Sequence, residues 1–190
     1  MKRILGVLAV SAASAALTAP AVANAAVNTA VTSIPTPNGI LEMHATADCA
    51  GDRCRFNTQA NLLGPNGPIG LPGDTWARQT ITLRSTDRSV WQEASYSAPS
   101  GSPRELHKGA NNNNVLSRML KATNNVEISV TYFGGGGLER FRVDGDSQPI
   151  DWRTGQPDRE ADFIACTQIQ VVSSGWNLTT PTACAQTNFG

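Results

Sequence analysis

The sequence predicts a mainly β fold, an antiparallel β-sandwich or small barrel with one short helix near residues 115–123 and two disulfides. Three observations predict this. About eight short segments alternate polar and apolar residues with a period of two, which is typical of half-buried strands. Clusters of Gly, Pro and Asn separate them, and four cysteines lie in two local groups.

The N-terminal segment has the pattern of an export signal. Lys2 and Arg3 precede an uncharged apolar stretch at residues 4–22, and Ala23-Asn24-Ala25 then supplies small residues at the −3 and −1 positions of a cleavage site. We therefore expect residues 1–25 to be a cleaved signal peptide and residues 26–190 to form a single secreted β-rich domain. The stretch is rich in small residues, unlike a spanning helix, so we expect no membrane anchor after cleavage and an extracellular or cell-envelope location.

The composition of the remaining chain excludes two classes of partner. Removing 25 of the 190 residues leaves 165, which is enough for one domain with its own core. The loss of Lys2 and Arg3 leaves 13 basic and 15 acidic residues, spread along the chain. Neither the concentrated basic face of a nucleic-acid-binding protein nor the basic amphipathic helix of a membrane-surface protein is present in the sequence.

The four cysteines indicate a disulfide-bonded protein of an oxidising compartment. Cys49 and Cys54 flank a short turn, and Cys166 and Cys184 lie near the C-terminus. Four cysteines allow three connectivities, of which the local one, Cys49–Cys54 with Cys166–Cys184, is the simplest. The spacing lacks the pattern of a structural zinc site, so we expect no metal and no cofactor.

In the first half of the chain, the alternation predicts strands in order. Residues 27–34 form a short strand, and residues 40–62 form a hairpin braced by the first disulfide. Strands at 76–85 and 89–96 are expected to be antiparallel neighbours across a polar turn. That pairing would place Trp76 and Trp91 on one face.

In the second half, one segment has helical spacing. Asn114 can serve as an N-cap, and the apolar residues that follow recur at helical spacing: Val115, Leu116, Met119 and Leu120. The segments 126–132 and 138–143 then predict a hairpin whose tip, the glycines 134–137, is flexible because glycine has no side chain to fix it. Residues 145–155 read as a loop, and residues 162–172 as a central strand.

Catalytic motifs are missing, although isolated candidates exist. The chain has no nucleophile elbow, zinc-protease motif or P-loop. His44 lies on the polar side of a strand, and His107 lies in a loop beside Glu105. Four carboxylates are candidates for a glycosidase pair: Glu93, Glu139, Asp144 and Asp146. The acidic residues at 144, 146 and 151 also leave open a loose calcium site, although they depart from the EF-hand order.

The leading interpretation is a secreted, non-catalytic binding or interaction domain. Exposed tryptophans are common binding groups on extracellular β-sandwiches, so Trp76 and Trp91 are the candidate binding residues. The sequence does not name the ligand; an envelope polysaccharide or another protein would suit such a surface. Two alternatives stay open: a small secreted hydrolase that uses His107 or a carboxylate pair, and a structural envelope protein.

Overall fold

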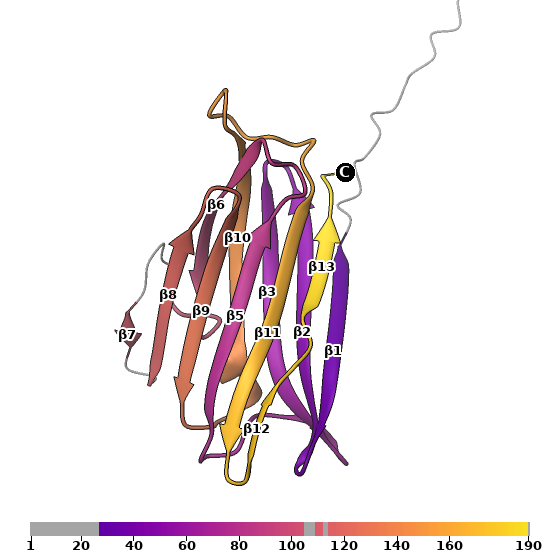
Figure 1. Ribbon diagram of the computed structural model, residues 1–190, viewed down its shortest axis with the longest axis vertical. Coiled ribbons are helices and arrows are strands. Elements are labelled where there is room, and N and C mark those ends of the chain that lie inside the picture. Colours follow the sequence, from indigo (N-terminus) through magenta and orange to yellow (C-terminus); the bar gives the residue numbers. More distant parts are fainter. Residues whose placement is uncertain (1–26, 105–108, 112–113, 190) are drawn as a thin grey trace, which may run out of the picture.

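Two antiparallel sheets packed face to face form the protein in the computed structural model, which describes residues 27–104, 109–111 and 114–189 (Figure 1). Sheet A has the order β1-β2-β3-β10-β6, with β4 added to β3, and sheet B has the order β12-β11-β5-β9-β8-β7, with β13 also pairing β11. The expected fold class, mainly β and sandwich-like with two disulfides, is therefore confirmed.

The strands of sheet A are β1 (Asn28–Thr36), β2 (Gly39–Ala50), β3 (Arg53–Gly64), β4 (Gly67–Ile69), β6 (Val90–Ser97) and β10 (Arg142–Asp151). Those of sheet B are β5 (Trp76–Arg84), β7 (Ala110–Asn111), β8 (Val115–Lys121), β9 (Asn125–Phe133), β11 (Phe163–Ser173), β12 (Trp176–Thr179) and β13 (Ala183–Thr187). One 3₁₀ turn, η1 (Leu138–Phe141), precedes β10. Within the described ranges, no helix has the length and apolar character needed to cross a membrane.

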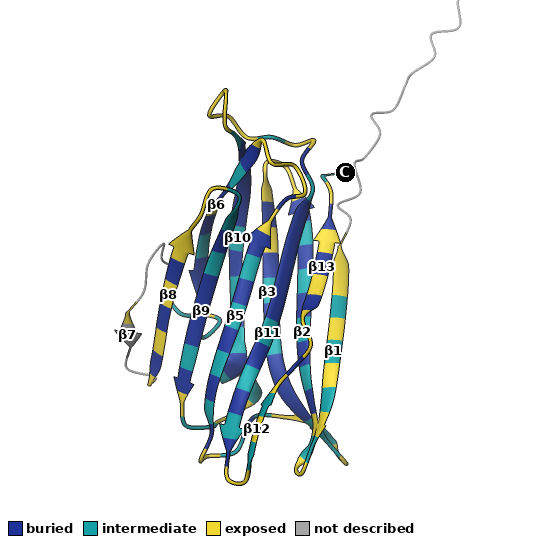
Figure 2. Ribbon diagram, in the orientation of Figure 1, coloured by how far each residue is buried: buried dark blue, intermediate teal, exposed yellow. Residues whose placement is uncertain are grey.

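The core lies between the sheets because alternate residues of each strand point inward. The bands of buried and exposed residues along the strands are visible in Figure 2. The largest fully buried side chains come from both sheets: Tyr96, Tyr132, Phe141, Phe163, Leu41, Met43, Leu62, Ile81, Leu83, Ile128, Ile169 and Gln79. One long edge is closed where Asn28 and Thr32 of β1 donate side-chain hydrogen bonds to backbone carbonyls of Gln186 and Pro181.

Both disulfides join register partners on adjacent strands. Cys49 and Cys54 close the end of the β2–β3 hairpin. Cys166 of β11 is bonded to Cys184 of β13, which fixes the C-terminal strand to sheet B. Disulfides of this kind are typical of proteins that fold outside the reducing cytosol.

The predicted helix at 115–123 is wrong, because this segment is strand β8. Val115, Ser117 and Met119 point inward, while Leu116 and Leu120 remain exposed on the outer face. The spacing of the apolar residues fits both the period of a helix and the two-residue period of a strand. The segment is a strand because it pairs with β9 along the whole length of β8. Asn114 has a positive φ of 53° instead of the extended conformation of an N-cap.

Three expected connections also differ from the structure. β5 and β6 are not neighbours, since β5 lies between β9 and β11 in sheet B and β6 pairs with β10 in sheet A. The segments at 126–132 and 138–143 form no hairpin, because the chain crosses to the other sheet between β9 and β10. Residues 145–151 belong to β10, so the expected loop begins later.

Candidate functional site

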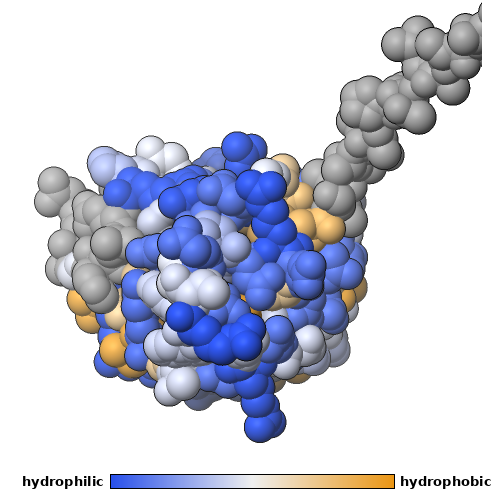
Figure 3. Space-filling model, turned by 90° about the horizontal axis from the view of Figure 1, so that it is seen from above, coloured by the Kyte–Doolittle hydropathy of each residue, from blue (hydrophilic) through white to orange (hydrophobic). Residues whose placement is uncertain are grey.

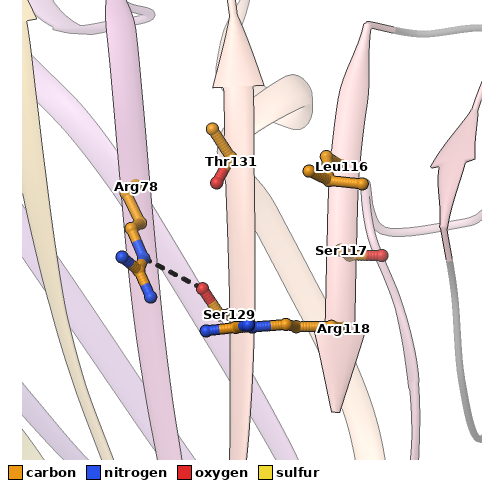
Figure 4. Close-up of a pocket in the computed structure, with 6 residues that line it drawn as sticks. All are labelled: Arg78, Leu116, Ser117, Arg118, Ser129 and Thr131. Atoms are coloured by element: carbon orange, nitrogen blue, oxygen red, sulfur yellow. Dashed lines mark hydrogen bonds between the residues drawn. The ribbon is translucent and has the colours of Figure 1, made fainter.

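A shallow pocket lies on the outer face of sheet B, over three neighbouring strands. Arg78 projects from β5, Ser129 and Thr131 from β9, and Leu116 and Arg118 from β8 (Figure 4). The register places Thr131 between Arg78 and Leu116, and Ser129 opposite Arg118. Two small hydroxyl side chains on the middle strand therefore form the floor of a pocket of about 240 Å³, with larger side chains on either side.

The electrostatics of this pocket favour an anion. Arg78 Nε donates a hydrogen bond to Ser129 Oγ at 3.1 Å, and Figure 4 shows Arg78 and Arg118 pointing toward each other from opposite sides of Ser129. Neither guanidinium forms an ion pair with any part of the chain that the structure describes. Two converging cations repel each other, and each offers the planar donor fork that binds carboxylate, phosphate or sulfate groups.

Two aromatic residues lie one row of residues from Arg78. Trp76 and Phe133 are register partners at the ends of β5 and β9. They occupy the same outer face as Arg78, because residues two apart on a strand share a face. The Phe133 ring is half exposed, at 50%, and Leu116 is 46% exposed. The sequence identified Trp76, but it gave no reason to join Arg78 with Arg118, which are brought together only by the order β5-β9-β8.

The structure separates the second predicted binding residue from the first. Trp91 lies in sheet A, so the expectation that it shares a face with Trp76 is wrong. Its ring packs on Trp152 with centroids 5.9 Å apart, and the Lys121 ammonium lies 5.5 Å from the Trp91 ring centroid. Figure 3 views the sandwich from above, and most of the residues visible on that end of the molecule are hydrophilic.

The candidate catalytic residues form no constellation among those the structure places. His44 Nε2 lies 3.4 Å from Glu42 Oε2 on the outer face of sheet A. Glu93 is exposed on β6, and Glu139 pairs with Arg142 at 3.4 Å. His107 and Glu105 lie outside the described residues.

The paired carboxylates on β10 are neutralised by arginines. Arg104 bridges Asp144, at 3.0 Å, and Asp146, and Arg53 binds Asp146 at 2.8 Å. Residues 142–151 form strand β10, so the acidic residues at 144, 146 and 151 do not lie in one loop. Asp151 instead accepts hydrogen bonds from the backbone of the next turn, and the Thr154 N–H holds the pKa of that carboxyl below its usual value. The described part of the chain contains no group of three or more His, Cys, Asp or Glu that could hold a metal ion.

Comparisons with known proteins give only distant similarity. No protein-family model matches the chain, and no curated protein matches it. Among solved structures, one described as a pore forming protein is 7% identical, with 85% of this chain and 87% of that chain covered and a TM-score of 0.26. The NetB toxin of Clostridium perfringens in its membrane-inserted form is 6% identical, with coverages of 86% and 92% and a TM-score of 0.24. Both are weak structural similarities to pore-forming proteins.

Proposed function

We propose that this protein is a secreted, non-catalytic binding domain whose sheet B recognises an acidic polysaccharide. The observation that carries the proposal is the convergence of the Arg78 and Arg118 guanidiniums over Ser129, without a carboxylate from the described chain to neutralise either of them. A bound carboxylate or sulfate would relieve the repulsion between the two cations and accept charge-assisted hydrogen bonds from both.

The neighbouring rings support a sugar as the carrier of the acidic group. Trp76 and Phe133 offer apolar surface along the strand direction, one row of residues from Arg78. A pyranose ring presents apolar C–H groups on one face and polar groups at its edge, so it can lie on an aromatic ring while its acidic group reaches the arginines. The pocket is open and shallow, which suits a repeating polymer that crosses the strands.

The first test removes one guanidinium at a time. Arg78→Gln and Arg118→Gln should each weaken binding to polygalacturonate or dextran sulfate by at least about tenfold, because a hydrogen bond to a charged group contributes about 1.5–3 kcal/mol. Isothermal titration calorimetry measures the affinity, and neutral dextran should not bind. Binding should also weaken with added salt.

Arg84→Gln is the matched control for these variants. Arg84 is exposed on the same strand, six positions after Arg78 and about 20 Å from it. Its loss changes the net charge equally but leaves the pocket intact, so affinity should stay within about twofold of the original. Equal losses in all three variants, or binding of neutral dextran, would contradict a specific anion site on sheet B.

The second test concerns the aromatic rings. Trp76→Ala should lower the affinity for the same polymers about tenfold, since the ring offers apolar contact beside the pocket. Trp91→Ala should leave affinity unchanged, because Trp91 lies in the other sheet and packs on Trp152. Thermal unfolding of both variants shows whether each remains folded. A loss of affinity in Trp91→Ala alone would place the sugar site at the Trp91–Trp152 pair instead.

A further inference from the structure

Two neighbouring pockets, of about 560 and 260 Å³, lie on the outer face of sheet A near the turn between β2 and β3. They share three lining residues: Asp48 of β2, Arg55 of β3 and Arg104 of the loop after β6. The two pockets therefore form one larger depression. Its walls carry seven charged side chains: Asp48, Asp52, Arg53, Arg55, Arg104, Asp144 and Asp146.

Arg55 lies between two aspartates and binds neither of them. The strand register aligns Asp48, Arg55 and Asp146 across β2, β3 and β10. Asp146 already accepts hydrogen bonds from Arg53, at 2.8 Å, and from Arg104. No ion pair joins Arg55 to Asp48 or to any other residue in the described ranges. The planar donor fork of Arg55 can therefore bind a carboxylate that enters the depression.

The Asp48 carboxylate has no cation bound to it within the same ranges. Its Oδ1 atom is inaccessible to solvent and accepts no hydrogen bond from a described residue, and the same holds for Oδ1 of Asp144. Arg104 binds Asp144 through the other oxygen, at 3.0 Å. Buried acceptors of this kind are rare, because the lost solvation is not compensated. Since the terminal torsion of an aspartate is soft, a small rotation turns either oxygen toward the pocket.

The register also sets the spacing of the two free charges. In an antiparallel pair, narrow and wide pairs of residues alternate. Cys49 and Cys54 form a narrow pair, with Cα atoms 3.9 Å apart, so the adjacent pair of Asp48 and Arg55 is a wide one of about 5.5 Å. The ammonium and carboxylate groups of an α-amino acid are attached to a single carbon atom. One such molecule can therefore bind both side chains at once.

The remaining charges favour a basic amino acid. Four aspartates and three arginines line the two pockets, which gives the depression a formal charge of −1. Asp52, in the larger pocket, accepts a hydrogen bond from the neutral Gln148 amide at 2.9 Å and forms no ion pair with the described chain. A ligand with one extra positive charge therefore suits this site better than a neutral or an acidic one.

We propose that this depression binds a free basic α-amino acid such as lysine. The α-ammonium group donates hydrogen bonds to Asp48 and Asp144 in the smaller pocket, and the α-carboxylate accepts two parallel hydrogen bonds from Arg55. The ligand's side chain extends into the larger pocket, where its terminal ammonium lies near Asp52. The site is on the opposite face of the sandwich from the pocket of sheet B, and it does not depend on the proposed binding of a sugar.

The first experiment compares ligands on the unaltered, purified protein. Titration with L-lysine, followed by heteronuclear NMR, should give saturable shifts of the backbone amides around Asp48 and Arg55. Lysine methyl ester lacks the α-carboxylate and Nα-acetyl-lysine lacks the α-ammonium, so each should bind at least about tenfold more weakly than lysine. The absence of saturable lysine binding up to about 10 mM, or equal affinities for lysine and either derivative, would overturn the proposal.

The second experiment removes one charge at a time. Arg55→Gln and Asp48→Asn should each weaken lysine binding at least about tenfold, because each loses a charge-assisted hydrogen bond to the ligand. Arg84→Gln and Glu160→Gln are the matched controls, since both residues are exposed and neither lines the depression. The controls should keep affinity within about twofold. Equal losses in the controls would show a general effect of net charge and contradict a specific site.

A direct ion pair between Asp48 and Arg55 in solution is the competing explanation. It predicts that lysine does not bind and that Asp48→Asn and Arg55→Gln are coupled in a double-mutant cycle of urea unfolding. That combination of results would overturn the proposal. Lysine binding that requires both α-groups supports it, because an internal ion pair leaves neither side chain free for the ligand. If Asp48→Asn does not fold, the comparison of lysine with its two derivatives still decides the question.

Discussion

Gly135→Ala should prevent stable folding, whereas Gly137→Ala in the same glycine run should change stability very little. A Cβ atom on Gly135 would overlap with the backbone carbonyls of Pro72 and Leu71, which cannot move away as a flexible side chain can. We expect a loss of more than about 4 kcal/mol, because relief of the overlap requires separating two backbone segments.

The contacts of this segment explain why the effect is so large. Gly134, Gly135 and Gly136 each donate a backbone hydrogen bond to the segment at 71–75, at 2.8, 3.3 and 3.0 Å. The two segments therefore lie backbone against backbone, which leaves no space for a side chain. The expectation that this run forms a flexible tip is wrong: glycine is needed here for close approach.

Gly137 is the matched control for Gly135. Its φ of −69° is available to any residue, and a Cβ there would meet nothing within 4 Å. Thermal unfolding monitored by circular dichroism, together with the yield of purified protein, compares the two variants. Similar melting temperatures for both would show that the two segments separate easily and would contradict the packed arrangement.

The parts of the fold that the sequence predicted correctly are those whose evidence is local. The β2–β3 hairpin was predictable because both strands alternate polar and apolar residues. In addition, the two cysteines that join the strands, Cys49 and Cys54, flank a single short turn. For β8, the apolar residues fit a helix and a strand equally well, and the segment is a strand because it forms a hairpin with the segment that follows it, β9.

Long-range pairing explains the remaining errors and the missed site residues. β6 follows β5 in the chain, but both edges of β5 are already occupied by β9 and β11, so β6 joins the other sheet. Arg78 and Arg118 are 40 positions apart in the sequence. No local pattern joins them, and only the position of β9 between their strands makes them neighbours.

Gln79→Leu is expected to lower the free energy of unfolding by about 4 kcal/mol, although leucine has a similar volume and is apolar. Gln79 is fully buried between the sheets. Its Nε2 donates to Thr58 at 2.7 Å and to Thr167 at 3.4 Å, and its Oε1 accepts from the Tyr132 hydroxyl at 3.0 Å. Burial raises the pKa of Tyr132, so this hydroxyl remains a donor.

The estimate follows from the groups that leucine would leave without a partner. Thr58 keeps its hydrogen bond to the Val143 carbonyl at 3.3 Å, but the Tyr132 hydroxyl would lose its acceptor and Thr167 its donor. Each unsatisfied buried polar group costs about 1–3 kcal/mol. Urea unfolding measures the loss, and an unchanged slope of the transition shows that the variant unfolds in the same way.

A double-mutant cycle with Tyr132→Phe tests whether the loss comes from the hydrogen-bond network and not from poor packing of leucine. Tyr132→Phe removes the hydroxyl that leucine at position 79 would leave buried and unpaired. The double variant should therefore be more stable than the sum of the two single losses predicts, by about 1–2 kcal/mol. Strictly additive losses would show that Tyr132 and Gln79 are not coupled, and the effect of Gln79→Leu would then lie in the shape of the core alone.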